Sequence, residues 1–217
     1  MGGRLVFKTY VGRPEADLLR QIAMTRLGSG LYLAKRFAEA SSVYGAELST
    51  LQRLGASEYE MLIAKGNLAL TYEQLGQDES ALSLEQEVFF GFRKLLGEEH
   101  PETLQVANNY ATTLLNLQRY GETKSLMRKT VPVAHRVLGA DNRLTLTLRS
   151  NYAMALYKAA GATLDDLREA ETTFEETERI ARRVMGGAHP LTLTFERDLR
   201  DARAVLRARE APSPGAA

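Results

Sequence analysis

Residues 109–118 read NYATTLLNLQ, and this stretch decides how the whole chain is organised. Asparagine is a mediocre residue inside a helix, because its amide competes for the backbone's own hydrogen bonds. The pattern nevertheless returns 42 residues earlier as NLALTYEQLG, from Asn67, and 42 residues later as NYAMALYKAAG, from Asn151. A polar residue that recurs together with its apolar neighbours indicates a repeating structural unit.

Short signals at the same spacing mark where helices end and begin. The stop signals are Leu54-Gly55, Leu96-Gly97, Leu138-Gly139 and Val184-Met185-Gly186. The start signals are His100-Pro101, His189-Pro190 and a degenerate copy, Asn142-Arg143. We expect each glycine to adopt the left-handed conformation just past a helix end. Proline suits the first helical position, so the two histidines are predicted to cap helices.

Each repeat reads as two helices, an A helix that carries the asparagine and a B helix that follows it. Turn residues separate the two helices at 76–81, 119–123 and 161–170. One helical hairpin cannot bury both of its faces, whereas stacked hairpins can. We therefore predict nine helices, which form four hairpins and a charged terminal helix within residues 195–210.

The predicted fold class is all-α, an α-solenoid of stacked antiparallel helical hairpins with a C-terminal capping helix. Residues 1–13 are expected to form an N-terminal arm, residues 14–210 the solenoid, and residues 211–217 a disordered tail. Within the arm, RLVFKTYV at 4–11 is the one stretch that could form a strand, and it is expected to dock or dangle.

Two local expectations follow from this helix assignment. Pro132 removes a backbone donor inside KTVPVAHRVLG, so that B helix should bend or break near Lys129–Val131. The terminal helix should act as a cap, because the last hairpin would otherwise expose its apolar face. Deletion of residues 189–217 is expected to uncover Ile180 and Val184.

The composition argues against catalysis and against several classes of partner. The chain is 44% hydrophobic, and its 28 basic residues nearly balance 27 acidic ones, which gives no global attraction to nucleic acid or a membrane surface. It has no cysteine, its three histidines lack metal-ligand spacing, and no glycine-rich phosphate loop follows a strand. We therefore expect no enzyme activity, no cofactor, no metal site and no membrane insertion, and a cytoplasmic or other intracellular location.

The A-helix signature Leu-Ala/Gly-x-x-Tyr resembles the tetratricopeptide repeat. The 42-residue period and the pattern LG-x-x-HP-x-TL-x-x-x-NLA are similar to the kinesin-light-chain type of that repeat. The resemblance covers about residues 18–210. It implies a right-handed superhelix whose concave groove is lined by the A helices and holds an extended segment of a partner protein.

The resemblance also implies a role for the recurring asparagines, which contact the ligand main chain in tetratricopeptide domains. The alternative is that each amide ties one repeat to the next, and both roles can hold. The candidate peptide-binding residues share the A-helix face that points toward the channel. They are Asn67, Leu70, Gln74, Gln105, Asn108, Asn109, Thr112, Asn116, Thr147, Asn151, Met154, Lys158 and Arg197.

Two functions remain open from the sequence. One is a peptide-binding adaptor that works through the concave face; the other is a structural subunit or assembly factor, built into a larger complex through its convex face and termini. Phe90, predicted to project from the far side of its B helix, would favour the second if exposed. The C-terminal arginines are expected to form ion pairs along solvated helices, or, near Arg197 and Arg200, to bind an acidic segment of a protein partner.

Overall fold

The computed structural model describes Pro14 and residues 18–211, and within these residues it contains nine helices and no strand. The segment 4–11, considered above as a possible strand, lies outside the described residues. The helices are α2 (Leu18–Leu33), α3 (Phe37–Leu54), α4 (Glu58–Gln74), α5 (Asp78–Leu96), α6 (Pro101–Asn116), α7 (Tyr120–Leu138), α8 (Arg143–Lys158), α9 (Leu164–Met185) and α10 (Pro190–Glu210). The prediction of an all-α fold with four hairpins and one further helix is confirmed.

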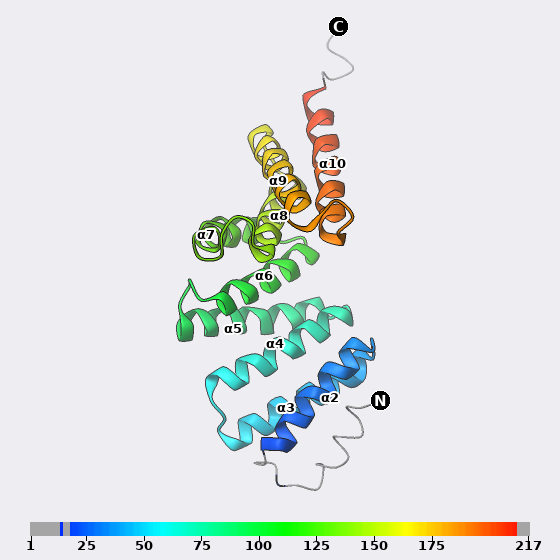
Figure 1. The fold of residues 1–217 in the computed structure, drawn as a ribbon. Coiled ribbons are helices and arrows are strands. Elements are labelled where there is room, and N and C mark those ends of the chain that lie inside the picture. Colours follow the sequence, from blue (N-terminus) through cyan, green and yellow to red (C-terminus); the bar gives the residue numbers. More distant parts are fainter. Residues whose placement is uncertain (1–13, 15–17, 212–217) are drawn as a thin grey trace. The chain divides into compact units, whose positions relative to one another are not determined.

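The chain divides into two compact units, one that ends at Gly97 and one that begins at Glu98. In the first unit, α2 packs on α3, α3 on α4 and α4 on α5. In the second, α8 packs against α6, α7 and α9, while α10 packs mainly on α9 and also touches α8 (Figure 1). Helices α2, α4, α6 and α8 are the A helices, α10 takes the next A position, and α3, α5, α7 and α9 are the B helices.

Small residues recur where an A helix lies closest to its neighbours. Ala69, Ala111 and Ala153 are all fully buried. The first hairpin has Gly28 at this position, and a Cβ built there would lie 2.5 Å from Cε1 of Tyr44 on α3. This position of the A helix therefore holds a small residue in each of the four hairpins. It is glycine in the first hairpin, where Tyr44 lies against it.

The B helices share a buried position that takes a large side chain in each hairpin. Its occupants are Tyr44, Glu85, Met127 and Phe174, spaced 41, 42 and 47 residues apart. Glu85 is fully buried, and neither carboxylate oxygen has a hydrogen-bond partner within the described part of the chain. Burial raises the pKa of Glu85 to about 8, with a further increase from the charge of Glu73 on α4. The sequence reading did not anticipate this buried carboxyl group.

Side-chain caps fix the starts of the A helices in the second unit, as predicted. Nδ1 of His100 accepts a hydrogen bond from the backbone N–H of Glu102 at 3.3 Å. Nδ1 of His189 accepts one from Leu191 at 3.2 Å. Oδ1 of Asn142 does the same for Leu144 at 2.8 Å, so the degenerate copy is a working cap. These bonds satisfy donors that a helix end leaves free.

The glycines after the B helices have positive φ, but only one adopts the predicted left-handed helical conformation. Gly55 does so, with φ 62° and ψ 38°. The other three combine a φ of 87–89° with an extended ψ of 156–169°: Gly97, Gly139 and Gly186. The prediction was therefore wrong for these three, because the chain leaves the helix directly in an extended direction. That backbone region is essentially restricted to glycine.

Replacing Gly139 with alanine is expected to lower the free energy of unfolding by about 1–3 kcal/mol, because alanine is strained at this φ and ψ. Nothing lies within 4 Å of the added Cβ, so the cost is conformational and not steric. Gly45→Ala is the matched control, since this position lies inside α3 and also has open space around it. There alanine should stabilise by about 0.5–1 kcal/mol. Urea titration of both variants measures the difference; equal effects would contradict this account.

Helix α7 runs without interruption from Tyr120 to Leu138 through Pro132, so of the predicted bend or break near Lys129–Val131 the break does not occur. Pro132 lies on the exposed side of α7, as does Arg128 one turn earlier, so water can satisfy the carbonyl that proline leaves without a donor. On the opposite side, Met127 and Ala134 are fully buried. Packing of that face holds the helix together across the proline.

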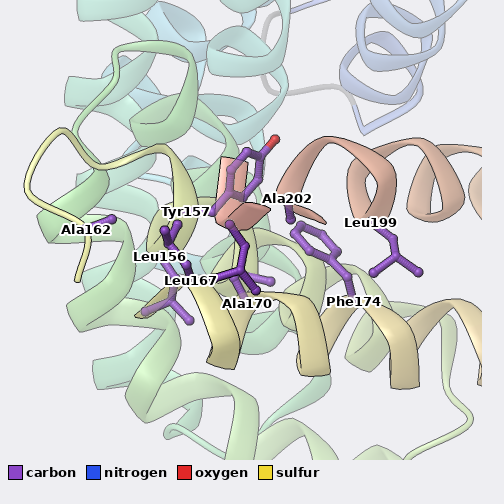
Figure 2. Packing of buried hydrophobic residues seen from close by; sticks show 10 residues of the cluster. Leu156, Tyr157, Ala162, Leu167, Ala170, Phe174, Leu199 and Ala202 are labelled. Carbon is purple, nitrogen blue, oxygen red and sulfur yellow. The ribbon is translucent and has the colours of Figure 1, made fainter. Parts of the chain in front are cut away.

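Helix α10 covers an apolar cluster of the last hairpin. Buried side chains of α8 and α9 meet Leu199, Ala202 and Leu206 of α10. Figure 2 shows this cluster, in which the rings of Tyr157 and Phe174 meet edge to face with centroids 5.8 Å apart. Val184 is already 48% exposed, so the prediction that the cap covers it was wrong.

Ion pairs connect successive repeats along the surface of the second unit. Arg136, near the end of α7, pairs with Glu99 at 2.6 Å, and Arg183, near the end of α9, pairs with Asp141 at 2.6 Å. Arg203 of α10 contacts Glu171 of α9 at 2.8 Å. The expectation that C-terminal arginines form ion pairs is confirmed for Arg183 and Arg203. Each exposed pair contributes at most about 1 kcal/mol.

Candidate functional site

The predicted peptide-binding residues are divided between the two units. Three lie on α4 of the first unit: Asn67, Leu70 and Gln74. The others lie on A-position helices of the second unit: Gln105, Asn108, Asn109, Thr112 and Asn116 on α6, Thr147, Asn151, Met154 and Lys158 on α8, and Arg197 on α10. Because α8 packs against both α6 and α10, the second unit brings its ten residues onto adjacent helices, and we call this set the amide face.

One pair of asparagines links neighbouring A helices directly. Nδ2 of Asn151 donates to Oδ1 of Asn108 at 3.1 Å, and this bond joins α8 to α6. Asn151 is only 5% exposed. The bond reaches Asn108 and not Asn109, the residue 42 positions before Asn151. For this pair, the structure shows the tie between repeats that the sequence left open as one of two roles.

Asn109 has a different environment. Its Oδ1 accepts a hydrogen bond from Nε2 of Gln105, one turn earlier on α6, at 3.2 Å. Within the described part of the chain, Nδ2 of Asn109 and Oδ1 of Asn151 form no hydrogen bond. Asn109 is half-buried and Gln105 is exposed. The amide face therefore offers an unused donor on α6 and an unused acceptor on α8.

The two threonines of the amide face bond to their own helices. The hydroxyl of Thr112 donates to the carbonyl of Asn108, and that of Thr147 to the carbonyl of Arg143, both at 3.0 Å. Such bonds one turn back are usual for threonine inside helices. These hydroxyls are therefore already satisfied as donors, and each keeps an oxygen able to accept a further hydrogen bond.

On α10, the site contains a buried acid, Asp198, that is not among the predicted peptide-binding residues. Asp198 is 4% exposed, and its Oδ2 has no partner among the described residues. Burial raises the pKa of Asp198, although nearby Arg197 acts in the opposite direction. Arg197 is exposed and contacts Oδ1 at 3.3 Å. The offset of 47 residues from Asn151 was the signal that could have identified Asp198.

Tyr157 lies beside this acid on α8. Burial, with smaller contributions from the charges of Asp198 and Asp201, raises the pKa of Tyr157 to about 12. The phenol therefore stays protonated at neutral pH and remains a hydrogen-bond donor. The ammonium group of Lys158 lies 5.8 Å from the centre of its ring. Met154, partly buried, packs against the same cluster and adds an apolar surface to the amide face.

The corresponding face of the first unit is more apolar. Asn67 and Leu70 are half-buried on α4, and Gln74 is exposed. One turn before Asn67, α4 carries Ile63, which is 41% exposed. The same position of the repeat is Gln105 on α6 and Thr147 on α8. The two units therefore present different chemistry on their A helices.

The described residues contain no group of three or more His, Asp or Glu side chains placed to hold a metal ion. None of the described helices is long and apolar enough to cross a membrane. The polar groups of the amide face are amides, hydroxyls and exposed cations. These groups can form hydrogen bonds with a bound chain.

Comparison with known families and structures identifies the repeat. A family model described as tetratricopeptide repeat matches residues 62–102 and 103–143. The crystal structure of kinesin-light-chain TPR-like repeats from Podosopora anserina superposes with a TM-score of 0.73 at 20% identity, covering 88% of each chain. The chain contains tetratricopeptide repeats, matched over residues 62–143. Its repeats are similar to the kinesin-light-chain type, as the 42-residue period predicted.

Curated relatives of this tetratricopeptide-repeat chain are much longer proteins. Protein KINESIN LIGHT CHAIN-RELATED 3 of Arabidopsis thaliana is 24% identical over 157 residues, which are 72% of this chain and 24% of that protein. A Clustered mitochondria protein homolog of Emericella nidulans is 23% identical over 131 residues, 59% of this chain and 11% of that protein. The chain thus spans a quarter or less of the length of these relatives. Repeats of this family typically serve as non-catalytic scaffolds for protein–protein interaction.

Proposed function

We propose that this tetratricopeptide-repeat chain is an adaptor that binds an extended peptide segment of a partner protein on the amide face. The observation that supports this most directly is the pair of unused amide groups, Nδ2 of Asn109 and Oδ1 of Asn151, on helices that pack together. A peptide main chain carries one donor and one acceptor at nearly every residue. Amides that offer both can pair with it whatever its side chains are.

The surroundings of these two amides favour a peptide over a small molecule. The amide face extends over α6, α8 and α10. Its residues include an exposed amide, a partly buried apolar side chain and an exposed cation, which are Asn116, Met154 and Lys158. A bound segment would place its main chain along the amides and an apolar side chain against Met154. Small-molecule sites are instead concave and mostly apolar.

We expect different effects from replacing two asparagines of the amide face. Asn109→Ala should weaken peptide binding a few-fold to tenfold, since one neutral hydrogen bond contributes about 0.5–1.5 kcal/mol. Its effect on the melting temperature should be small, because its one bond to Gln105 is on the surface. Asn151→Ala should lower the melting temperature, because it removes the buried bond to Asn108.

The measurement uses peptides selected by display on the wild-type chain, with affinity from calorimetry and stability from thermal unfolding. Asn116→Ala, an exposed position at the end of α6, serves as a second affinity probe. Gln52→Ala, an exposed residue of α3 in the first unit, is the control that should change neither quantity. If Asn109→Ala and Asn116→Ala both left the affinity of every selected peptide unchanged, the amide face would not be the binding surface.

A second candidate function is that of a structural subunit that docks through a B helix. Phe90 of α5 is 42% exposed, with the guanidinium of Arg93 4.8 Å from its ring centre. An exposed aromatic ring beside an arginine is typical of a protein contact. Phe90→Ser should then abolish incorporation into a larger complex, measured by size-exclusion chromatography of cell extract, without change in peptide affinity. Unchanged elution would argue against this candidate.

A further inference from the structure

Two polar groups lie buried without a hydrogen-bond partner where α10 meets α8. Asp198 of α10 is 4% exposed, and Tyr157 of α8 is 9% exposed. Within the described part of the chain, neither Oδ2 of Asp198 nor the phenol oxygen of Tyr157 forms a hydrogen bond. Buried polar groups in folded proteins are almost always paired, so two unpaired groups in one place need a chemical explanation.

The packing of α10 on α8 brings these two groups together. Tyr157 belongs to the same apolar cluster as Ala202, which lies one turn after Asp198 on α10. Figure 2 shows the ring of Tyr157 beside Ala202, with its hydroxyl at the edge of the cluster and directed away from Leu156. Besides burial, the charges of Asp198 and Asp201 raise the pKa of Tyr157, so both carboxylates lie near the phenol. We call Tyr157, Asp198 and Asp201 the acid cluster.

The cation next to Asp198 leaves one of the two carboxylate oxygens unused. Nε and Nη2 of Arg197 lie 3.4 and 3.3 Å from Oδ1 of Asp198, so both contacts end on the same oxygen. Asp201 is exposed and forms no ion pair with a described residue. The acid cluster therefore keeps free acceptors on both carboxylates.

Two repeat positions that are neutral in the earlier hairpins are acidic on α10. They are the asparagine position, Asn67, Asn109, Asn151 and Asp198, and the position three residues later, Leu70, Thr112, Met154 and Asp201. An amide both donates and accepts hydrogen bonds, whereas an ionised carboxylate only accepts them. At these positions α10 thus calls for a donor group, which the amides of the earlier helices do not.

The surroundings of the acid cluster favour a cationic ligand over an acidic one. Lys158 and Arg197 also lie near Asp198, and the sequence left open that arginines here bind an acidic segment. Both cations are exposed, so water solvates them. The unpaired oxygen of Asp198 is enclosed, and a buried carboxylate is costly unless a cation or hydrogen-bond donors compensate its charge.

We propose that the acid cluster binds a lysine or arginine side chain of the peptide segment held on the amide face. This inference rests on the proposed function, because it names the chemistry of one residue of that segment. The peptide cation contacts the exposed Asp201 and takes the place of Arg197 beside Asp198, so that both carboxylates are paired. The phenol oxygen of Tyr157 accepts a further hydrogen bond from the same cation.

The test uses peptides selected by display on the wild-type full chain. Each lysine and arginine of a peptide is replaced in turn by glutamine, and calorimetry gives the affinity for the wild-type chain and for Asp198→Asn. Loss of one basic residue should weaken binding to the wild-type chain about tenfold to a hundredfold, since hydrogen bonds between charged groups are strong. With Asp198→Asn the same loss should change the affinity less than about threefold, because the two groups no longer interact.

Two further variants show whether the effect belongs to this site. Asp165→Asn is the matched control, because it removes the same charge from α9, where the side chain is 96% exposed. The basic residue should contribute as much to binding of this control as to the wild-type chain. Arg197→Ala should leave the affinity of the basic peptides unchanged or raise it, because it removes a competing cation. Thermal unfolding checks that Asp198→Asn, which keeps the shape of the side chain, is folded.

Three results would overturn the inference. If Asn109→Ala and Asn116→Ala weaken binding but no basic peptide residue is coupled to Asp198, the proposed function stands and this inference alone fails. If Arg197→Ala weakens binding and an acidic peptide residue is essential, the site binds an acidic segment instead. If neither Asn109→Ala nor Asn116→Ala changes the affinity of any selected peptide, the proposed function fails, and this inference with it.

Discussion

Glu85→Met is expected to raise the free energy of unfolding by roughly 3–5 kcal/mol above pH 8, because it removes a buried carboxylate. The equivalent positions in the other hairpins hold Tyr44, Met127 and Phe174, so the space accepts a large side chain. The wild-type carboxylate is fully buried, and both of its oxygens lack partners within the described residues. Methionine removes this desolvated group and keeps the volume.

The effect should depend on pH in a defined direction. Glu85 has a pKa of about 8 in the folded chain, because burial and the nearby charge of Glu73 disfavour the carboxylate. In the unfolded chain the pKa returns to about 4.5, so the folded state binds the proton more tightly. The wild-type chain should therefore lose stability as pH rises from about 4.5 to 8 and level off above that. The gain from Glu85→Met should grow over the same window.

Chemical denaturation at a series of pH values measures both effects. Glu85→Gln is the control, because it removes the charge but keeps an unpartnered polar group. The stability of Glu85→Gln should lack the pH dependence that the carboxyl group causes in the wild-type chain. Its free energy of unfolding should rise by less than that of Glu85→Met. If the stability of Glu85→Met followed the same pH curve as the wild-type chain, the titration would belong to another group.

Removal of residues 189–217 should destabilise the second unit by roughly 5 kcal/mol or more, because several large side chains lose their cover. Tyr157 and Phe174 would face water on the side now covered by Leu199 and Leu206. Ion pairs of Arg203 with α9 would also be lost. We expect a lower melting temperature, increased ANS binding and aggregation at concentrations at which the full chain stays monodisperse.

Two point variants of α10 test whether the destabilisation comes from loss of its buried side chains and not from shortening of the chain. Phe195 is 2% exposed and Leu193, two residues earlier, is 51% exposed. Phe195→Ala should cost about 3–5 kcal/mol, whereas Leu193→Ala should change stability by less than about 1 kcal/mol. Equal, small effects in both variants, together with an unchanged melting temperature of the truncated chain, would show that α10 does not act as a cap.

The sequence was sufficient to predict most of the fold, because the helix limits are encoded locally. The start signals at His100-Pro101 and His189-Pro190 place the beginnings of α6 and α10, and Asn142 caps α8 in the same way. Capping, proline and glycine preferences depend on a few neighbouring residues, so they can be read without the tertiary structure. The uninterrupted α7 was missed because burial of one helix face outweighs the local cost of Pro132.

The site was less predictable, since it depends on how helices pack. Sequence spacing pairs Asn109 with Asn151, whereas the hydrogen bond between repeats uses Asn108. A shift of one residue moves a side chain by 100° around its helix. The angle between the two helices decides which asparagine of α6 meets Asn151, and this angle cannot be derived from the sequence spacing. The burial of Glu85 was missed for a related reason: a glutamate among other charged residues of α5 reads as part of a solvated face.

The ion pairs between repeats also bear on how such a chain can change in length. Glu99 and Asp141 are 42 residues apart and occupy the same place in successive loops, and each meets an arginine from the B helix that follows. Loss of residues 100–141 would join Glu99 to Asn142 and present Glu99 to Arg183 in place of Asp141. The capping asparagine would also stay in its place ahead of α8. A gene encoding this chain could therefore gain or lose a whole period of codons and still supply matching charges and a helix start at the new junction.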